Sequence, residues 1–184
     1  MSTTEALTTE ALIAQLHKVD GKAEIVDGRI VRMAPTGDDP GSASGEVFVS
    51  LRMHAKQHGH RAYGDTIAYL VDLPNRKSVA PDASYYTGPR SGMKFLPQAP
   101  DFAVEVRSEN GYGPAAEEAM AAKRADYFAA GTKAMWDVDL LSDVVVRVYR
   151  AENPNEPTLY RRGDTAEAEP AVAGWTMPVD DLFE

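Results

Sequence analysis

The sequence predicts an α/β protein in which a mixed β-sheet is flanked by helices. Three observations indicate this class: a hairpin pattern near the N-terminus, two helical segments at about 45–59 and 115–130, and runs of strand-forming residues between and after them. Helices separated by strand runs are typical of a mixed sheet with helices on its faces. The 184 residues are enough to bury a substantial core, and no linker divides them. We therefore expect one domain.

The N-terminal residues predict a short helix followed by a β-hairpin. TTEAL occurs twice within residues 1–12, and each Thr can cap a helical start, so we expect an extension over residues 1–11 that leads into a helix. In AEIVDGRIVRM, at 23–33, Asp27-Gly28 suits the positive φ angles of a two-residue turn between β-branched residues. This segment predicts the N-terminal hairpin.

The remaining elements follow from periodicity and from the positions of Gly and Pro. Residues 34–45 are rich in Pro, Gly, Asp and Ser and predict a loop, followed by an amphipathic helix that ends at Gly59. The second helix, about 115–130, is rich in Ala and ends at Gly131. Strands are expected at 66–72, 79–86, 101–107, 134–139 and 143–150, with a weaker one near 158–162.

The net charge argues against tight, non-specific binding of nucleic acid. It is −9 at pH 7, whereas affinity for nucleic acid comes largely from Lys and Arg side chains that neutralise phosphates. Such binding would require basic residues to gather on one face. The most basic stretch is formed by Arg52, Lys56, His60 and Arg61 with two further His, and it is either a solvated helix face or a contact for a polyanion.

The sequence also limits where the protein works. No segment approaches the roughly 18 to 20 apolar residues that span a bilayer, so we expect no membrane partner. The N-terminus lacks the basic start and apolar core of a secretory signal. With no Cys, the chain has neither disulfides nor thiolate metal ligands. A cytoplasmic location fits these observations best.

Two acidic residues are candidates for a functional site. In the run 101–107, alternation places Glu105 and Arg107 on one face, and Glu105 is framed by Val residues. Burying such a carboxylate is costly unless it meets a cation, a metal or several donors. Asp82 follows Pro81 at the start of another strand run. The structural alternatives are an ion pair for Glu105 and a turn for Asp82.

Two carboxylates on adjacent strands can share one divalent ion, such as Mg²⁺ or Mn²⁺, with waters completing the octahedron. Such sites usually include a cation as well. Arg107 shares the face of Glu105, but it stays protonated and cannot act as a base. Lys123 is centred on a mostly apolar stripe of the second helix that includes Tyr127, so we expect it to point toward protein. Snorkelling is the ordinary alternative for this lysine.

Five segments, taken in order, resemble the Uma2 family of the PD-(D/E)XK nuclease superfamily. They are AEIVDGRIVRMAP, PDASYY, PDFAVEVRS, the helix with Lys123 and Tyr127 ahead of Gly131, and MWDVD. The resemblance extends over roughly residues 12–184, nearly the whole chain. It implies a single domain with a restriction-endonuclease-like core: a mixed sheet between helices, with the active site at one edge.

The resemblance also implies roles for individual residues. Asp82 and Glu105 correspond to the two acids of the motif. The lysine of the superfamily belongs two positions after the second acid, where this chain has Arg107, so Lys123 fits the role of a lysine supplied from the following helix. Glu24 matches another recurrent acidic position, either near the site or supporting the hairpin, and Tyr127 is a possible support.

The leading hypothesis is therefore a Mg²⁺- or Mn²⁺-dependent phosphodiesterase that acts on DNA, with Lys123 near the attacking water and Arg107 as electrostatic support. The alternative is an inactive, nuclease-like binding or assembly module in which the acids are ion-paired to Arg107 and Lys123. Hydrolysis of a small phosphoester is a third possibility, and it suits an acidic protein better. The family resemblance also implies a homodimer.

Overall fold

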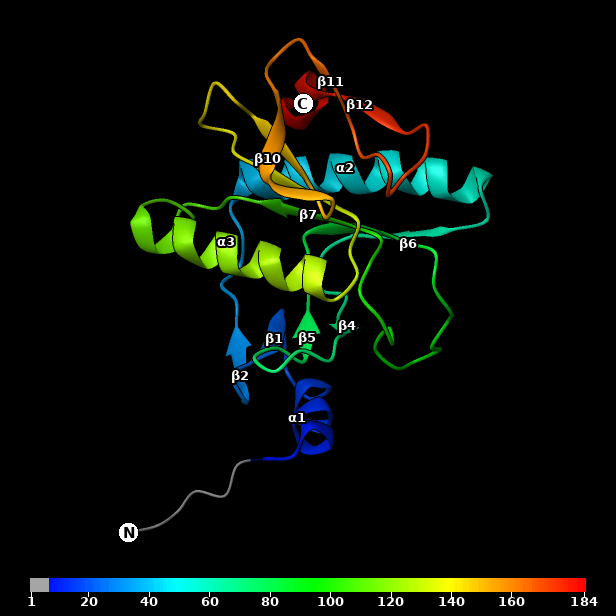
Figure 1. The fold of residues 1–184 in the computed structure, drawn as a ribbon, viewed down its shortest axis with the longest axis vertical. Helices are drawn as coiled ribbons and strands as arrows, with labels where there is room; N and C mark the ends of the chain where they lie inside the picture. Colours follow the sequence, from blue (N-terminus) through cyan, green and yellow to red (C-terminus); the bar gives the residue numbers. More distant parts are fainter. Residues whose placement is uncertain (1–6) are drawn as a thin grey trace.

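The structure, a computed structural model, describes residues 7–184 and is built on a six-stranded mixed sheet (Figure 1). In spatial order its strands are β10 (Asn153–Tyr160), β9 (Val146–Arg150), β8 (Ala134–Val138), β7 (Phe102–Val106), β6 (Ala83–Tyr86) and β3 (Arg61–Tyr63). Strands β7 and β8 are parallel, and the other neighbours are antiparallel. Helix α3 (Pro114–Ala129) connects the two parallel strands, as a crossover between parallel strands requires.

One face of the sheet is covered by a helix and by the C-terminal segment (Figure 1). These elements are α2 (Asp38–Gln57), the two-stranded pair β11 (Thr165–Glu167) and β12 (Thr176–Pro178), and the 3-10 helix η1 (Val179–Phe183). The apolar stripe of α2, formed by Val47, Leu51 and Ala55, is fully buried in this core, as expected for an amphipathic helix. Phe102 and Trp136 of the sheet pack edge to face there, with ring centroids 5.6 Å apart, which is a favourable aromatic geometry.

The opposite face is covered by α3 and by the short pair β4 (Tyr69–Leu70) and β5 (Ser78–Val79) (Figure 1). Beyond this pair lie the hairpin of β1 (Ala23–Val26) and β2 (Arg29–Arg32) and helix α1 (Thr9–Leu16), which pack together in a separate core. Asp27 and Gly28 form the hairpin turn with φ angles of 49° and 69°, as predicted. Since Ala103 and Glu105 of β7 point to this face while Phe102 and Val104 point to the other, the strand alternates as expected.

Several elements differ from the prediction. Strands β3, β11 and β12 and the 3-10 helix were not expected, β9 begins later than the expected 143–150, and β10 lies at 153–160 instead of 158–162. Three further boundaries also changed. Helix α2 begins at Asp38, so most of the expected loop 34–45 is helical. Pro40 is tolerated in the first turn of a helix, and two Asp residues there favour the helix dipole. The strand expected at 66–72 contracts to β4, and the run 79–86 divides into β5 and β6 around Pro81-Asp82.

The structure describes only residues 7–11 of the expected N-terminal extension, residues 1–11. Residues 1–6 lie outside the described residues, whereas α1 already begins at Thr9, with the side chain of Thr8 accepting a hydrogen bond from the Ala11 N–H at 3.2 Å. This is the threonine cap that the repeat predicts. Among residues 7–184, none of the helices has both the length and the apolar character needed to cross a membrane.

Candidate active site

Asp82 and Glu105 are brought together by the pairing of β6 with β7. The register of the two strands ends at Ala83 paired with Val104, and Asp82 and Glu105 are the residues next to this pair on the two chains. Two hydrogen bonds fix this end: the Asp82 N–H donates to the Val104 carbonyl at 2.9 Å, and the Val106 N–H donates to Asp82 Oδ2 at 2.7 Å. Burial opposes protonation of Lys22, but the charges of Glu105 and Asp82 raise its pKa, so both acids lie near this one ammonium group.

Glu105 is buried and is held by α3. Glu105 is only 7% exposed, as its position between two valines predicts. The Lys123 Nζ lies 2.7 Å from Glu105 Oε1, and the Tyr127 hydroxyl donates to the same oxygen at 2.7 Å. Lys123 and Tyr127 are one helical turn apart, which is why a single helix presents both groups to one carboxylate. Lys123 thus points inward from its apolar stripe.

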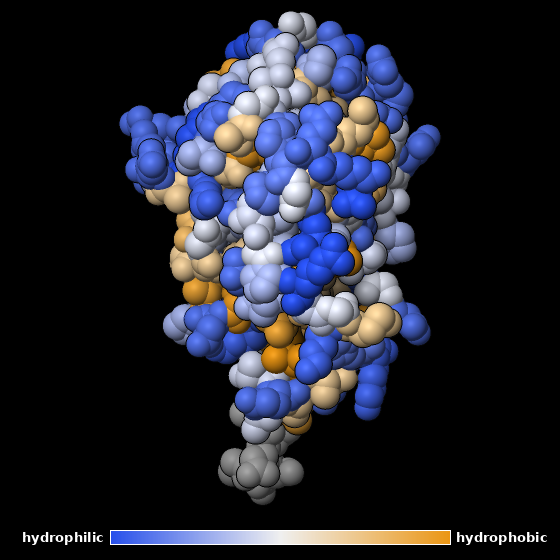
Figure 2. Space-filling model, turned by 90° about the vertical axis from the view of Figure 1, so that its right-hand side faces the viewer, coloured by the Kyte–Doolittle hydropathy of each residue, from blue (hydrophilic) through white to orange (hydrophobic). Residues whose placement is uncertain are grey.

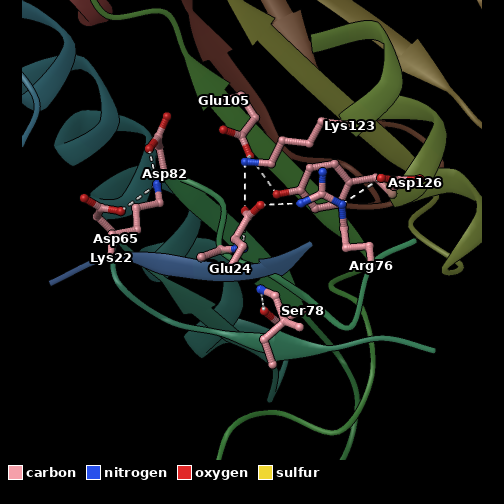
Figure 3. Close-up of polar contacts among 12 residues, drawn as sticks. Lys22, Glu24, Asp65, Arg76, Ser78, Asp82, Glu105, Lys123 and Asp126 are labelled. Carbon is pink, nitrogen blue, oxygen red and sulfur yellow. Dashed lines mark hydrogen bonds and ion pairs between the residues drawn. The ribbon is translucent and has the colours of Figure 1, made fainter. Parts of the chain in front are cut away.

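Glu24 comes from the hairpin and meets the same lysine from the other side (Figure 3). Its Oε1 lies 3.0 Å from Lys123 Nζ and accepts a hydrogen bond from the Ala80 N–H at 2.8 Å, while Oε2 pairs with Arg76. Arg76 also donates to Asp126 at 2.7 Å. Glu24 therefore contacts the candidate lysine and also ties the hairpin to the residues before β6.

Lys22 is a member of the site that the sequence reasoning missed. Its Nζ lies 2.5 Å from Asp82 Oδ1 and 2.8 Å from Asp65 Oδ1. The signal was present in the sequence: Lys22 and Glu24 are two residues apart at the start of a strand, so they share one face of it. Strand alternation, applied to Lys22 and Glu24 as it was to Glu105 and Arg107, identifies Lys22 as a candidate site residue.

The protonation equilibria of the two buried acids are shifted in opposite directions. Burial raises the pKa of Glu105, and the attraction of Lys123 offsets this rise only in part. Burial acts on Glu24 in the same sense, but Lys123 and Arg76 together lower its pKa below the ordinary value. Burial opposes protonation of Lys123, yet Glu105 and Glu24 raise its pKa. Lys123 is thus held as a cation between one firmly ionised acid and one that binds a proton more readily.

Arg107 does not join these residues, although it shares their face of the sheet. Its Nε and Nη2 donate to the two carboxylate oxygens of Asp137 at 2.8 Å each, and it also pairs with Glu117 of α3. The side chains of Arg107 and Asp137 are 5% and 1% exposed. The hypothesis that Arg107 neutralises Asp82 or Glu105 by ion pairing is therefore wrong in that detail, because Asp137 and Glu117 occupy its guanidinium.

The net charge of the candidate site is negative and would be balanced by a divalent cation. The ion pairs link five carboxylates to three cations, an excess of two negative charges when all are ionised: Glu24, Asp65, Asp82, Glu105 and Asp126 against Lys22, Arg76 and Lys123. We call these eight residues the site cluster. Within residues 7–184, no group of three or more His, Cys, Asp or Glu side chains is arranged to hold a metal ion. The donor set fits an ion bound by two carboxylates and completed by water, the arrangement that Mg²⁺ accepts.

Comparison with known proteins agrees with this fold. Residues 10–180 match the model of the Uma2 family, which is described as "Putative restriction endonuclease". Among solved structures, the chain is similar to the crystal structure of a "putative nuclease belonging to DUF820" from Anabaena variabilis, with a TM-score of 0.72 and 18% identity over 94% of this chain and 97% of that one. No curated protein matches the chain. The predicted mixed sheet with flanking helices and an N-terminal hairpin is confirmed.

Proposed function

The chain belongs to the Uma2 family, and from this premise we propose that it is a nuclease: a phosphodiesterase that uses Mg²⁺ or Mn²⁺ to hydrolyse DNA. The observation that carries the proposal is that Asp82 and Glu105 lie at the adjoining ends of the paired segments of β6 and β7, each in contact with a lysine. Two acids that can hold a divalent ion, with a lysine of the covering helix beside one of them, provide the groups for metal-assisted hydrolysis of a phosphate ester. The excess negative charge of the site cluster supports the same conclusion.

In this proposal Asp82 and Glu105 hold the ion, which when bound lowers the pKa of a water and offsets charge on the phosphate. The surrounding residues position these two acids. The Val106 N–H fixes one oxygen of Asp82, and Tyr127 fixes one oxygen of Glu105. Both contacts are present without a substrate, so the carboxylates need little rearrangement to bind the ion. Such preorganisation is the condition for efficient electrostatic catalysis.

Lys123 is assigned the role of a hydrogen-bond donor. Its pKa is raised by Glu105 and Glu24, so it stays protonated at neutral pH and is unsuited to remove a proton from water. A protonated lysine has three donors and no acceptor. It can therefore orient the attacking water or contact a phosphate oxygen while Glu24 holds it in place. Lys22 is protonated in the same way, beside Asp82.

The direct test is nicking of supercoiled plasmid DNA by purified protein in the presence of Mg²⁺ or Mn²⁺. Wild-type protein should nick the plasmid, chelation should stop it, and Asp82→Ala should abolish it. Asp72→Ala is a matched control, because Asp72 is an exposed acid outside the site cluster whose contact is a surface pair with Lys77. Undiminished activity in Asp82→Ala would refute the site assignment.

One observation favours the alternative of an inactive binding or assembly module. Asp82 and Glu105 are each paired with a lysine, so the acids are already neutralised in part without a metal. Titration calorimetry with Mn²⁺ separates the two functions. A metal site should give a binding heat that disappears in Asp82→Ala, whereas a closed ion-pair cluster should give none in either protein.

A further inference from the structure

A groove with a volume of about 1060 Å³ opens beside the site cluster. Its walls come from the C-terminal half of α2, from β3 and the residues that follow it, and from the loop 90–96 between β6 and β7. The volume is slightly above the roughly 300–1,000 Å³ typical of ligand pockets. The groove is therefore large enough for a ligand that extends beyond one small molecule.

The charge of this groove is opposite to that of the protein. Five Lys or Arg residues line it, together with His60, but only one of the 28 acidic residues of the chain does so. The five are Arg52, Lys56, Arg61, Arg90 and Lys94. The Nε of Arg61 is buried and has no hydrogen-bond partner among the described residues. In a protein with a net charge of −9, such a concentration of cations is a local site for a polyanion.

The groove also presents aromatic and apolar side chains between its cations. Phe48, Tyr63 and Phe95 line it, and Phe95 is stacked on His17 with ring centroids 3.8 Å apart. Met93, at the tip of the loop, is 98% exposed. Figure 2 shows the side of the molecule at the right of Figure 1, where hydrophobic residues lie among a majority of hydrophilic ones. A positively charged groove that is also lined by aromatic side chains is typical of surfaces that bind unpaired bases and their backbone.

The loop 90–96 is held in a defined shape. The Lys94 N–H donates to the Ser91 carbonyl at 3.1 Å, and the Ser91 hydroxyl donates to the Lys94 carbonyl at 2.9 Å. Gly92 takes a φ of 62° in this turn, a conformation that suits glycine. Leu96 then bonds to the backbone of Ala68 and Leu70. These hydrogen bonds fix the backbone of the loop that carries Arg90 and Lys94.

The groove and the site cluster share one residue, Asp65. Asp65 lines the groove, and it shares the ammonium group of Lys22 with Asp82, at 2.8 Å and 2.5 Å. We propose that this groove binds single-stranded nucleic acid and guides its backbone toward Asp82. The inference rests on the proposed function and deepens it by naming the form of the substrate. A basic groove with aromatic side chains suits one strand, because the bases of a duplex are already stacked on one another and cannot stack on the protein.

The test is fluorescence anisotropy of labelled 12-mers, as single-stranded DNA, single-stranded RNA and duplex DNA, in EDTA at about 50 mM salt. Wild-type protein should bind at least one single strand more tightly than the duplex. Lys56→Ala/Arg90→Ala removes two exposed cations of the groove and should weaken binding at least tenfold. The slope of log affinity against log salt should fall by about 1.4, since each contact with a single strand contributes about 0.7.

The control variant is Arg29→Ala/Arg32→Ala, which removes two exposed cations of β2 and should change affinity less than twofold. The inference is overturned by equal losses in the two variants, by tighter binding of the duplex, or by no binding of any 12-mer to the wild type. Because EDTA prevents metal-dependent cleavage, the assay is independent of catalysis. A protein that binds strands through the groove but never nicks DNA contradicts the proposed function alone.

Discussion

Two acids on neighbouring strands meet cations of different kinds. Glu105 on β7 and Asp137 on β8 are paired in register, so both lie on the face covered by α3. Asp137 receives two parallel hydrogen bonds from the fork of Arg107, both at 2.8 Å. Glu105 receives one ammonium group and one hydroxyl, and both contact its Oε1. The same sheet therefore holds a bidentate arginine pair beside a lysine pair.

The difference separates a structural contact from a functional one. A guanidinium that engages both oxygens of a carboxylate leaves that acid little capacity for another ligand. A lysine is a compact point charge, and the acids around Lys22 and Lys123 outnumber the cations of the site cluster. We infer that the Arg107–Asp137 pair fixes β7 against β8. The two contacts of Glu105 instead fall on one oxygen, and Asp82 is held by one lysine and one backbone N–H, which a metal can displace more easily than an arginine fork.

The largest effect is expected from removing the charge of each acid in turn. Glu105→Gln should slow DNA nicking about a thousandfold, equivalent to about 4 kcal/mol, because a metal ligand is lost. Asp137→Asn makes the same chemical change one strand away. It should leave the rate per folded molecule within about threefold, a difference of less than about 1 kcal/mol. Plasmid nicking at equal concentrations of folded protein measures both, and equal losses would contradict the division between the two pairs.

Stability should show the reverse order when the cations are removed. Arg107→Met leaves Asp137 buried without its two donors and should lower the free energy of unfolding by about 3–5 kcal/mol. Lys123→Met should cost about 1–3 kcal/mol, because Glu105 keeps Tyr127 and Glu24 keeps Arg76. Urea denaturation followed by circular dichroism compares them. A larger loss for Lys123→Met would show that the lysine, not the arginine, is the main structural cation.

Local patterns in the sequence were enough to predict much of the fold. The alternation in 101–107 predicted that Glu105 is buried, and the turn at Asp27-Gly28 predicted the hairpin. The early start of α2 was missed because Pro40 and two Gly residues resembled a loop. The acidic residues and Pro in the first turn were nevertheless the signal of a helix start.

The assignment of Arg107 shows what local patterns do not contain. Alternation correctly placed it on the face of Glu105, but its partner was decided by the register of β7 with β8, which brings Asp137 beside it. A parallel pairing between strands about 30 residues apart is set by tertiary packing, not by either segment alone. Asp82 depended in the same way on its register with β7. The grouping of five cations in one groove likewise joins α2 to a loop about 40 residues away.

The smallest expected effect is a contrast in pH dependence between the two buried glutamates in the absence of divalent ions. The pKa of Glu24 is lowered from its ordinary 4.5, so its ionisation stabilises the fold above that pH, and this contribution is lost as the pH falls through the folded value. Glu24→Gln should therefore be less stable than wild type at pH 7, and the difference should shrink below pH 4.5.

The pKa of Glu105 is raised from the same 4.5, so its ionisation opposes folding above the raised value and has no effect below pH 4.5. Glu105→Gln should therefore be at least as stable as wild type at pH 7, and the advantage should vanish as the pH falls to 4.5. Urea midpoints measured between pH 4 and pH 8 in EDTA compare the two variants. The same sign of change in both at pH 7 would contradict the opposite environments of the two acids. Opposite changes in stability at pH 7 would mean that an ionised Glu24 stabilises the fold. An ionised Glu105 would then cost stability, as expected of an acid that serves the candidate site.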